Sequence, residues 1–168
     1  MKSKTMDDML YNLLQDVYYA EKHLVKALTK MAKESADPEL EKAFSEHKTE
    51  TETHVERLDH AFEMIDKKPK AKKCDAILGI IAEGEEVMDE AESEQLKDAG
   101  LIGAAQAAEH YEIARYGTLC AWAKQMGNQR LADLLHETLE EEKKADSLLT
   151  KIAKKSVNEA AMSAASAA

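Results

Sequence analysis

The sequence has few residues that would interrupt a helix. It contains only two prolines, Pro38 and Pro69, and neither lies inside a long run of apolar residues at helical spacing. Aromatic residues make up 5% of the chain, and no segment alternates apolar and polar residues as a half-buried strand does. Alanine, leucine, glutamate, lysine and methionine, which favour helices, dominate instead. These features predict an all-α protein, and 168 residues suffice for one domain with a real core.

The chain has fewer basic than acidic residues, 23 against 33, so its formal net charge is −10. Nucleic acids and anionic membrane surfaces are bound by basic faces, so neither is an expected partner. No run approaches the roughly 20 apolar residues of a membrane span, and the N-terminus lacks the apolar core of a signal peptide. We therefore expect a cytoplasmic protein. Any glutamates that point inward would need cations to offset their charge.

Cysteine is scarce, with Cys74 and Cys120 far apart in the sequence. Neither a Cys-x-x-Cys motif nor a cysteine–histidine spacing typical of zinc fingers occurs. Their apolar neighbours favour two buried thiols over a disulfide. A metal site in this chain would therefore use oxygen and imidazole ligands, which suit iron or manganese.

The apolar residues predict five helices, at about residues 6–33, 38–65, 74–91, 97–126 and 128–154. Asp37 and Pro38 are typical of a helix start, and Gly127 with Asn128 ends one helix and begins the next. The layout is a ferritin-like four-helix bundle of two helical hairpins joined by a crossover helix, over residues 1–155. We expect the second hairpin to repeat the first in parallel. Residues 156–168 are rich in alanine and serine and predict a flexible tail.

Acidic and imidazole side chains interrupt the apolar stripe at the centre of each long helix. The interruptions are Glu21 on the first helix, His47, Glu50 and His54 on the second, Glu109 and Glu112 on the third long helix, and Glu142 and Asp146 on the last. Glu21 precedes Glu112 by 91 positions, and the matching pairs on the other two helices are 92 positions apart. Such a set, with ligands supplied by both helices of each hairpin, is typical of a site for two metal ions per chain. Iron is the expected metal, with manganese or zinc as alternatives.

A purely structural interpretation competes with the metal site. A single glutamate on an apolar helix face usually reaches solvent at the edge, but four central interruptions at matching positions are harder to explain in that way. Buried Lys22 or Arg115 would offset the charge, yet helical phase turns both outward. The same phase predicts surface positions for His23, His60, His110 and His136 and a solvated face for Glu140 and Glu141. Three residues remain open between hydrogen-bonding the carboxylates and ordinary core packing: Tyr18, Tyr111 and Tyr116.

Several phrases in the sequence resemble one bacterial family. QAAEHYEIARYGTL (residues 106–119), CDAILGIIAEGEE (74–86), EHKTETETHVERL (46–58) and ETLEEEKKAD (137–146) are similar to the YciF/YciE family of ferritin-like stress proteins. The resemblance covers almost the whole chain apart from the tail. It implies a bundle related to rubrerythrin, often dimeric, in a family without a firmly assigned reaction.

The resemblance also implies ligand positions, and the sequence departs from some of them. Glu21 matches the ligand on the first helix of rubrerythrin-like diiron proteins, and Glu109 with Glu112 resembles their glutamate pair. Those proteins carry Glu-x-x-His on the other two helices, where this chain has Thr53 and Ala145 at the histidine positions. His54 and Asp146 are the substitute ligands, one residue later.

Three functions follow as expectations. The first is a stress protein whose diiron or dimanganese site reacts with oxygen or peroxide, as a ferroxidase or peroxidase. The second is a structural or regulatory bundle in which the metal only stabilises the core or is absent. The third, which has the least support, is iron storage in a larger shell. In each case we expect a homodimer, because the apolar residues of the 74–91 helix leave surface uncovered in a single chain.

Overall fold

A computed structural model describes residues 4–165 of the chain. Its elements are α1 (Met6–Glu34), α2 (Pro38–Glu63), α3 (Asp75–Glu90), α4 (Glu94–Gln125), α5 (Gln129–Ile152), the π-helical segment η1 (Ala153–Val157) and α6 (Asn158–Ala165). No strand occurs among the described residues. The prediction of an all-α protein is confirmed, and the five predicted helices correspond to α1 through α5. No helix among these residues is long and apolar enough to cross a membrane.

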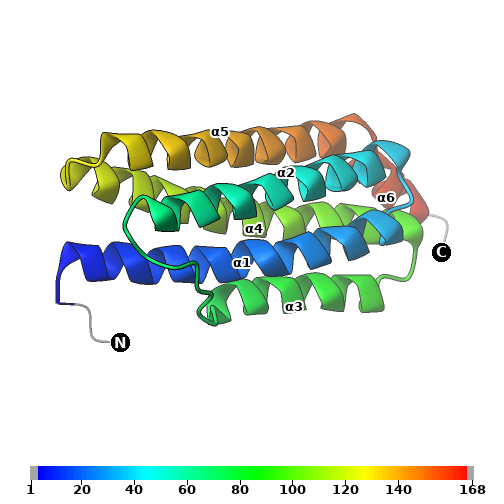
Figure 1. Ribbon diagram of the computed structural model, residues 1–168. Coiled ribbons are helices and arrows are strands. Elements are labelled where there is room, and N and C mark those ends of the chain that lie inside the picture. Colours follow the sequence, from blue (N-terminus) through cyan, green and yellow to red (C-terminus); the bar gives the residue numbers. More distant parts are fainter. Residues whose placement is uncertain (1–3, 166–168) are drawn as a thin grey trace.

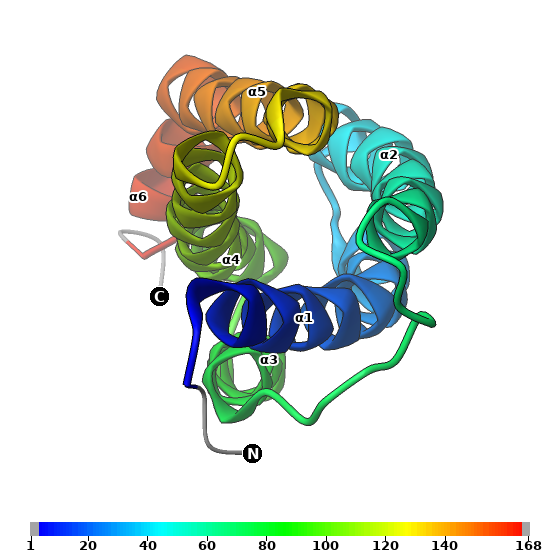
Figure 2. The same ribbon diagram turned by 60° about the vertical axis from the view of Figure 1, so that its left-hand side comes forward.

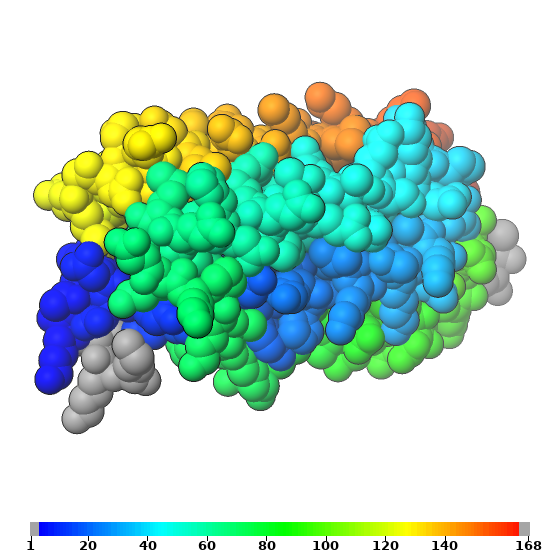
Figure 3. All heavy atoms as spheres, in the orientation of Figure 1, coloured from blue at the N-terminus to red at the C-terminus, as the bar shows by residue number. Residues whose placement is uncertain are grey.

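Four helices form the bundle, and α3 lies outside it. Viewed along the bundle, α1, α2, α5 and α4 surround a common interior, while α3 packs on the outer side of α1 and α4 (Figure 2). In the space-filling view, the side chains of α1, α2 and α5 close over that interior (Figure 3). The two hairpins and the crossover helix are therefore confirmed as the ferritin-like arrangement.

The relative direction of the two hairpins differs from our expectation. The crossover helix α3 runs the length of the bundle, so α4 begins beside the end of α1 and runs in the opposite direction to it (Figure 1). The second hairpin is therefore an inverted rather than a parallel repeat of the first. The mid-points of the four helices still lie at one level, and this brings the central polar residues together.

Local sequence signals set the two hairpin turns. The Asp37 carboxylate accepts hydrogen bonds from the backbone N–H groups of Glu39 and Leu40, at 2.8 and 3.0 Å. Gly127 adopts a φ of 78°, and the Asn128 side chain then accepts from the Leu131 N–H. Both predicted helix starts are thus confirmed.

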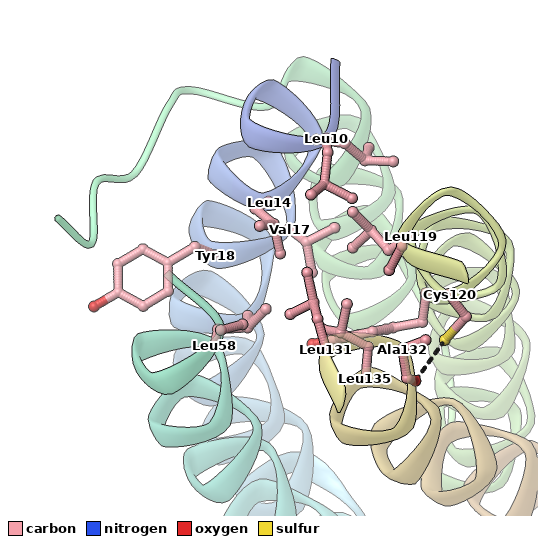
Figure 4. Close-up of a cluster of buried hydrophobic side chains, with 14 of the residues drawn as sticks. Leu10, Leu14, Val17, Tyr18, Leu58, Leu119, Cys120, Leu131, Ala132 and Leu135 are labelled. Atoms are coloured by element: carbon pink, nitrogen blue, oxygen red, sulfur yellow. Dashed lines mark hydrogen bonds between the residues drawn. The ribbon is translucent and has the colours of Figure 1, made fainter. Parts of the chain in front are cut away.

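The apolar core is divided into two ends. One cluster contains Leu14, Leu58 and Leu135 and lies near the α4–α5 turn, as Figure 4 shows in close-up. The other contains Phe44 and Leu149 and lies near the α1–α2 turn. Apolar side chains from several helices fill each end, and the polar residues that interrupt the apolar stripes lie between the two ends. Both cysteines are free and buried, as predicted.

The crossover helix packs closely on the bundle. Ile77 is fully buried in a cluster with Leu24 and Ala108. Gly100 on α4 is necessary for this approach, because a Cβ there would collide with the Val87 side chain. None of the apolar residues Ile77, Ile80, Ile81, Val87 and Met88 is left exposed.

The prediction of a flexible tail from residue 156 does not hold for residues 156–165. These residues continue the last helix through η1 into α6, which packs against α4. Val157 and Ala161 are buried, and the Val157 side chain packs in the apolar cluster near the α1–α2 turn, so this segment has apolar surface to bury after all. The end of the predicted tail, residues 166–168, lies outside the described part of the chain.

Candidate metal centre

Six polar side chains meet at the middle level of the bundle, between the two apolar ends. All six side chains are buried, and they come from all four bundle helices: Glu21 on α1, His47 and His54 on α2, Glu109 and Glu112 on α4, and Glu142 on α5. Glu21, His54 and Glu142 have no exposed surface at all. These six residues are among the eight predicted from the sequence.

The cluster divides into two groups of three that share one residue. Glu21, His54 and Glu142 offer ligand atoms within 4.8 Å of one another, and so do His47, Glu109 and Glu142. His54 Nδ1 lies 2.9 Å from Glu142 Oε1, and His47 Nε2 lies 3.1 Å from Glu109 Oε1. Glu142 therefore stands between two imidazoles, each of which has a second carboxylate beside it.

Five buried carboxylate oxygens of this cluster lack hydrogen-bond partners. They are Glu21 Oε2, Glu109 Oε2, Glu112 Oε1 and both carboxylate oxygens of Glu142, and the same holds for His54 Nδ1. His54 Nδ1 is close to Glu142, but the two groups are not aligned as donor and acceptor. Several unpaired buried polar atoms cost free energy unless a bound cation takes them as ligands. The donor set of carboxylate oxygens and imidazole nitrogens fits iron, manganese or zinc.

Burial and mutual repulsion shift the carboxyl pKa values upward. Burial, together with the charges of Glu142, Glu21 and Glu109, raises the pKa of Glu112 well above its usual value. Burial raises the pKa of Glu142 to about 7, with a further contribution from the Glu109 carboxylate. Without metal, part of this cluster holds protons at neutral pH.

The pKa values of the two histidines are also raised, but the cause is the neighbouring carboxylates and not burial. Burial lowers the pKa of His54, but the neighbouring Glu142 and Glu21 outweigh it and raise that pKa to about 10. In the same way, Glu109 and Glu50 raise the pKa of His47 well above 6.5 against the effect of burial. Imidazolium groups therefore supply the positive charge of the metal-free cluster, because no lysine or arginine among the described residues is fully buried.

A second layer of polar contacts holds the inner residues in place. The other imidazole nitrogen of His54, Nε2, lies 3.0 Å from Glu141 Oε2. Arg57 holds Glu141 through two hydrogen bonds, of 2.6 and 3.3 Å, and also donates to Thr138. On the opposite side, the fully buried Tyr116 hydroxyl donates to Glu21 Oε1. These contacts fix which atoms of His54 and Glu21 face the centre.

Two of the eight predicted residues lie away from the cluster. Glu50 has a side chain that is 40% exposed and lies 3.4 Å from the outward nitrogen, Nδ1, of His47. Asp146 receives a hydrogen bond from Gln106 and faces His110. On an α-helix a residue four positions on is rotated by about 40°, and this small offset moves Asp146 out of line with Glu142. Metal ligation remains a prediction for all eight residues.

Glu141 and Arg57 are not expected from the sequence, and the role of Tyr116 stays open there. Glu141 adjoins Glu140, whose side chain is 45% exposed, on a face expected to be solvated. A signal was present on the facing helix: His54 and Arg57 are three residues apart and therefore present an imidazole and a guanidinium to the same neighbour. Of the three open tyrosines, Tyr116 contacts a cluster carboxylate, whereas Tyr111 bonds with Cys74 and Tyr18 with Lys22.

The fold and the cluster define a ferritin-like bundle with carboxylate and histidine groups able to hold a metal ion. A family model described as a domain of unknown function (DUF892) matches residues 5–162. The chain belongs to this family.

Individual relatives agree with this assignment. The chain is 46% identical to the protein YciF of Escherichia coli K12 over 162 residues, which cover 96% of this chain and 98% of YciF. The solved structure of that protein, described as a stress protein, has a TM-score of 0.89 at 93% coverage of this chain and 99% of the other. YcfI from Rhodopseudomonas palustris is 40% identical, with a TM-score of 0.86 at 89% and 98% coverage.

A more distant structure bears on the fold alone. A two-domain protein from Anabaena variabilis, with DJ-1/ThiJ/PfpI-like and ferritin-like domains, is 19% identical to this chain. Its TM-score is 0.62, and the match covers 92% of this chain and 38% of the larger protein. The chain is thus a homologue of YciF with a ferritin-like fold.

Proposed function

We propose that this protein holds two iron ions at the centre of its bundle and acts with them on oxygen or peroxide in a stress response. The observation that carries the proposal is the pair of three-residue groups that share Glu142. Glu21 and His54 would hold one ion and His47 and Glu109 the other, with Glu142 between them. The stress role is carried over from the E. coli relative, which is described as a stress protein.

Charge balance supports two divalent ions. The four fully inward carboxylates, Glu21, Glu109, Glu112 and Glu142, carry four negative charges when ionised, and two divalent ions carry four positive charges. The histidines would then be neutral ligands, and the protons that they hold in the metal-free state would leave on binding. Such ions, when bound, supply redox and Lewis-acid chemistry toward oxygen or peroxide.

The chain's own residues would set the geometry of this site. Tyr116 orients the Glu21 carboxylate by its hydrogen bond, and Glu141 fixes the His54 ring so that Nδ1 faces the centre. The apolar clusters at both ends exclude water from the interior, and this strengthens every electrostatic interaction within it.

Elemental analysis of protein purified without chelators and reconstituted with iron(II) tests the proposal. We expect two ions per chain in the wild type and loss of both in Glu142→Gln, since both groups use this residue. Glu140→Gln is the matched control, because Glu140 lies on the same helix, has a side chain that is 45% exposed, and pairs with Lys143. Negligible iron, manganese and zinc after reconstitution would contradict the proposal.

A second candidate, a structural bundle that needs no metal, has one observation in its favour. His47 and His54 place positive charge beside the buried carboxylates, so protons alone can hold the cluster together. Peroxide or oxygen consumption separates the two functions. The metal-dependent function predicts consumption by the iron-loaded wild type that Glu142→Gln lacks, whereas the structural function predicts none in either protein.

A further inference from the structure

An apolar cavity of about 40 Å³ lies beneath the crossover helix, between α1, α3 and α4. Its walls are mostly aliphatic and thioether side chains: Leu24, Leu28, Met31, Ile80, Ile81 and Met88. On its inner side it reaches His47, Glu109 and Glu112 of the central cluster. The cavity therefore connects the outer layer of the protein with the candidate metal centre along a nonpolar path.

A second cavity approaches the same centre from another side and has a different character. It is about 260 Å³ in volume and lies between α2 and α5. The charged residues Glu46, Glu50 and Lys144 line it together with His47 and with apolar residues such as Phe44 and Leu149. His47 thus lines both cavities and is the only cluster residue that does so. The carboxylates of Glu46 and Glu50 suit this groove to the entry of a cation, which leaves the apolar cavity without that role.

We propose that the cavity under α3 is a binding site for dioxygen, which reaches the metal centre through it. The inference rests on the proposed function and specifies its oxidant. A molecule of hydrogen peroxide or a chain of waters needs hydrogen-bond partners, and the aliphatic walls provide none between the Lys30–Glu85 ion pair at the outer edge and the cluster itself. Dioxygen is nonpolar and small, and apolar cavities of this kind bind nonpolar molecules while staying dry.

The boundary of the cavity is built from small residues and one ion pair. Ala104, Ala105 and Ala108 form the α4 side, and a Cβ on Gly84 would come within 3.3 Å of the Ala104 Cβ. At the outer edge, Lys30 on α1 and Glu85 on α3 form an ion pair of 3.2 Å, and both residues line the cavity. Larger residues on α4 would fill the space, and this makes the site open to a direct test.

Oxygen-induced relaxation of methyl NMR signals tests the proposal without any catalytic readout. The full-length chain, metal-free or loaded with diamagnetic zinc, is compared under oxygen and under argon. We expect the methyl groups of Leu24 and Leu28 to relax severalfold more under oxygen than those of Leu13 and Leu139, which are buried to a similar degree in the apolar core. Equal enhancement of the two sets would overturn the proposal.

Substitutions within α4 provide the matched comparison. Ala104→Leu should remove the excess relaxation, whereas Ala107→Leu, an exposed position on the same helix, should leave it intact. Met88→Ala enlarges the cavity and should increase the effect, so it carries the test if Ala104→Leu does not fold. Persistence of the effect in a folded Ala104→Leu, or no increase in Met88→Ala, would contradict the assignment.

Iron-loaded protein then tests the route. Ala104→Leu should slow oxidation of bound iron(II) by dioxygen severalfold and leave oxidation by hydrogen peroxide as it is in Ala107→Leu. Equal slowing by both oxidants would overturn the selectivity. Failure of the chain to bind metal would refute the proposed function, and the relaxation experiment on the metal-free chain would still report on the cavity alone.

Discussion

Among the individual residues, Glu112 has the least favourable surroundings for a charged group. It is buried, one of its oxygens has no hydrogen-bond partner, and three other glutamates raise its pKa. Glu112→Gln keeps the shape of the protonated side chain and removes the possibility of charge. We expect the metal-free variant to melt at or above the wild-type temperature at about pH 8, by about 2–4 °C for each kcal/mol gained. Calorimetry of the metal-free proteins measures this.

The same substitution should weaken metal uptake, because it removes one of four inward carboxylates. Stability and metal binding would then move in opposite directions, as is typical of a functional site. Glu140→Gln serves as the control and should change neither quantity, since the Glu140 side chain is 45% exposed and pairs with Lys143 outside the cluster. If Glu112→Gln and Glu140→Gln bound equal amounts of metal, the assignment of Glu112 to the site would be wrong.

Glu141 acts on the centre only through His54. Glu141→Gln weakens the acceptor that orients the imidazole, and loss of such an outer partner typically reduces metal affinity by about 10–100-fold. Titration calorimetry with manganese or zinc measures the affinity, and NMR of the His54 ring in the zinc-loaded protein reports which nitrogen carries the proton. Glu137→Gln is a close control, because Glu137 also pairs with Arg57 but is largely exposed and does not contact His54. An unchanged ring tautomer in Glu141→Gln would exclude this positioning role.

At the scale of elements, η1 and α6 lengthen the last helix beyond the bundle proper. Val157 is 2% exposed and belongs to the apolar cluster near the α1–α2 turn. Val157→Ala should lower the free energy of unfolding by about 1–2 kcal/mol, through lost burial and a residual cavity. Lys154→Ala, at an exposed position of η1, should change it little. Chemical denaturation of the two variants decides whether this segment contributes to stability or merely follows α5.

Element positions also explain what α3 contributes. This helix has apolar residues on the side that meets α1 and α4, and Gly100 permits its close approach. It thereby covers the outer wall of the bundle next to the cluster, at a place where α1 and α4 alone would leave Leu24 and Ala108 accessible. The crossover is thus both a connection and a cover for the site.

At the scale of the whole molecule, metal binding and pH should be linked. The raised pKa values of Glu112 and Glu142 mean that the metal-free fold binds more protons than the unfolded chain, so its stability falls as pH rises from about 4.5 through about 7. His54 acts in the same direction: its contribution is complete below about 6.5 and is lost as pH rises through about 10.

Metal binding requires the same groups to be deprotonated, so metal affinity rises with pH. The increase in Tm caused by metal should therefore be larger at about pH 8 than at about pH 5.5, with about 2.7 kcal/mol of stabilisation at a metal concentration of 100 times Kd. Melting curves with chelator and with excess manganese at both values measure this. A difference in Tm between the two conditions that is constant, or that becomes smaller toward higher pH, would argue against ligands inside the bundle.

Association of two chains remains a prediction. The family resemblance implies a dimer. Of the apolar residues of α3 that suggested an uncovered surface, Ile77 is buried, and Ile80, Ile81, Val87 and Met88 are half-buried. Light scattering at concentrations of tens of micromolar should give twice the mass of the 18.7 kDa chain. The mass of a single chain would contradict the prediction.

Much of the structure could be predicted from local patterns. The spacing of leucines such as Leu10, Leu14 and Leu28 marks the inner face of α1, and Asp37, Gly127 and Asn128 mark the turns, because helix periodicity and capping are properties of a few neighbouring residues. The same periodicity identifies Glu21, Glu112 and Glu142 as interruptions of an apolar stripe. The sequence therefore also predicts that acidic side chains meet at the middle of the bundle.

Three outcomes depended on the packed structure. Glu50 and Asp146 lie on the edge of their helices' inner faces, and only the rotation of each packed helix decides whether such a residue points inward or to a groove. Arg57 holds Glu141 in place beside His54. The two residues are 84 positions apart and meet only because α2 and α5 are neighbours. The direction of the second hairpin follows from the length of the crossover. Periodicity thus determined which residues form the helices and the site, while helix rotation and pairing, which depend on contacts distant in sequence, decided how each acts there.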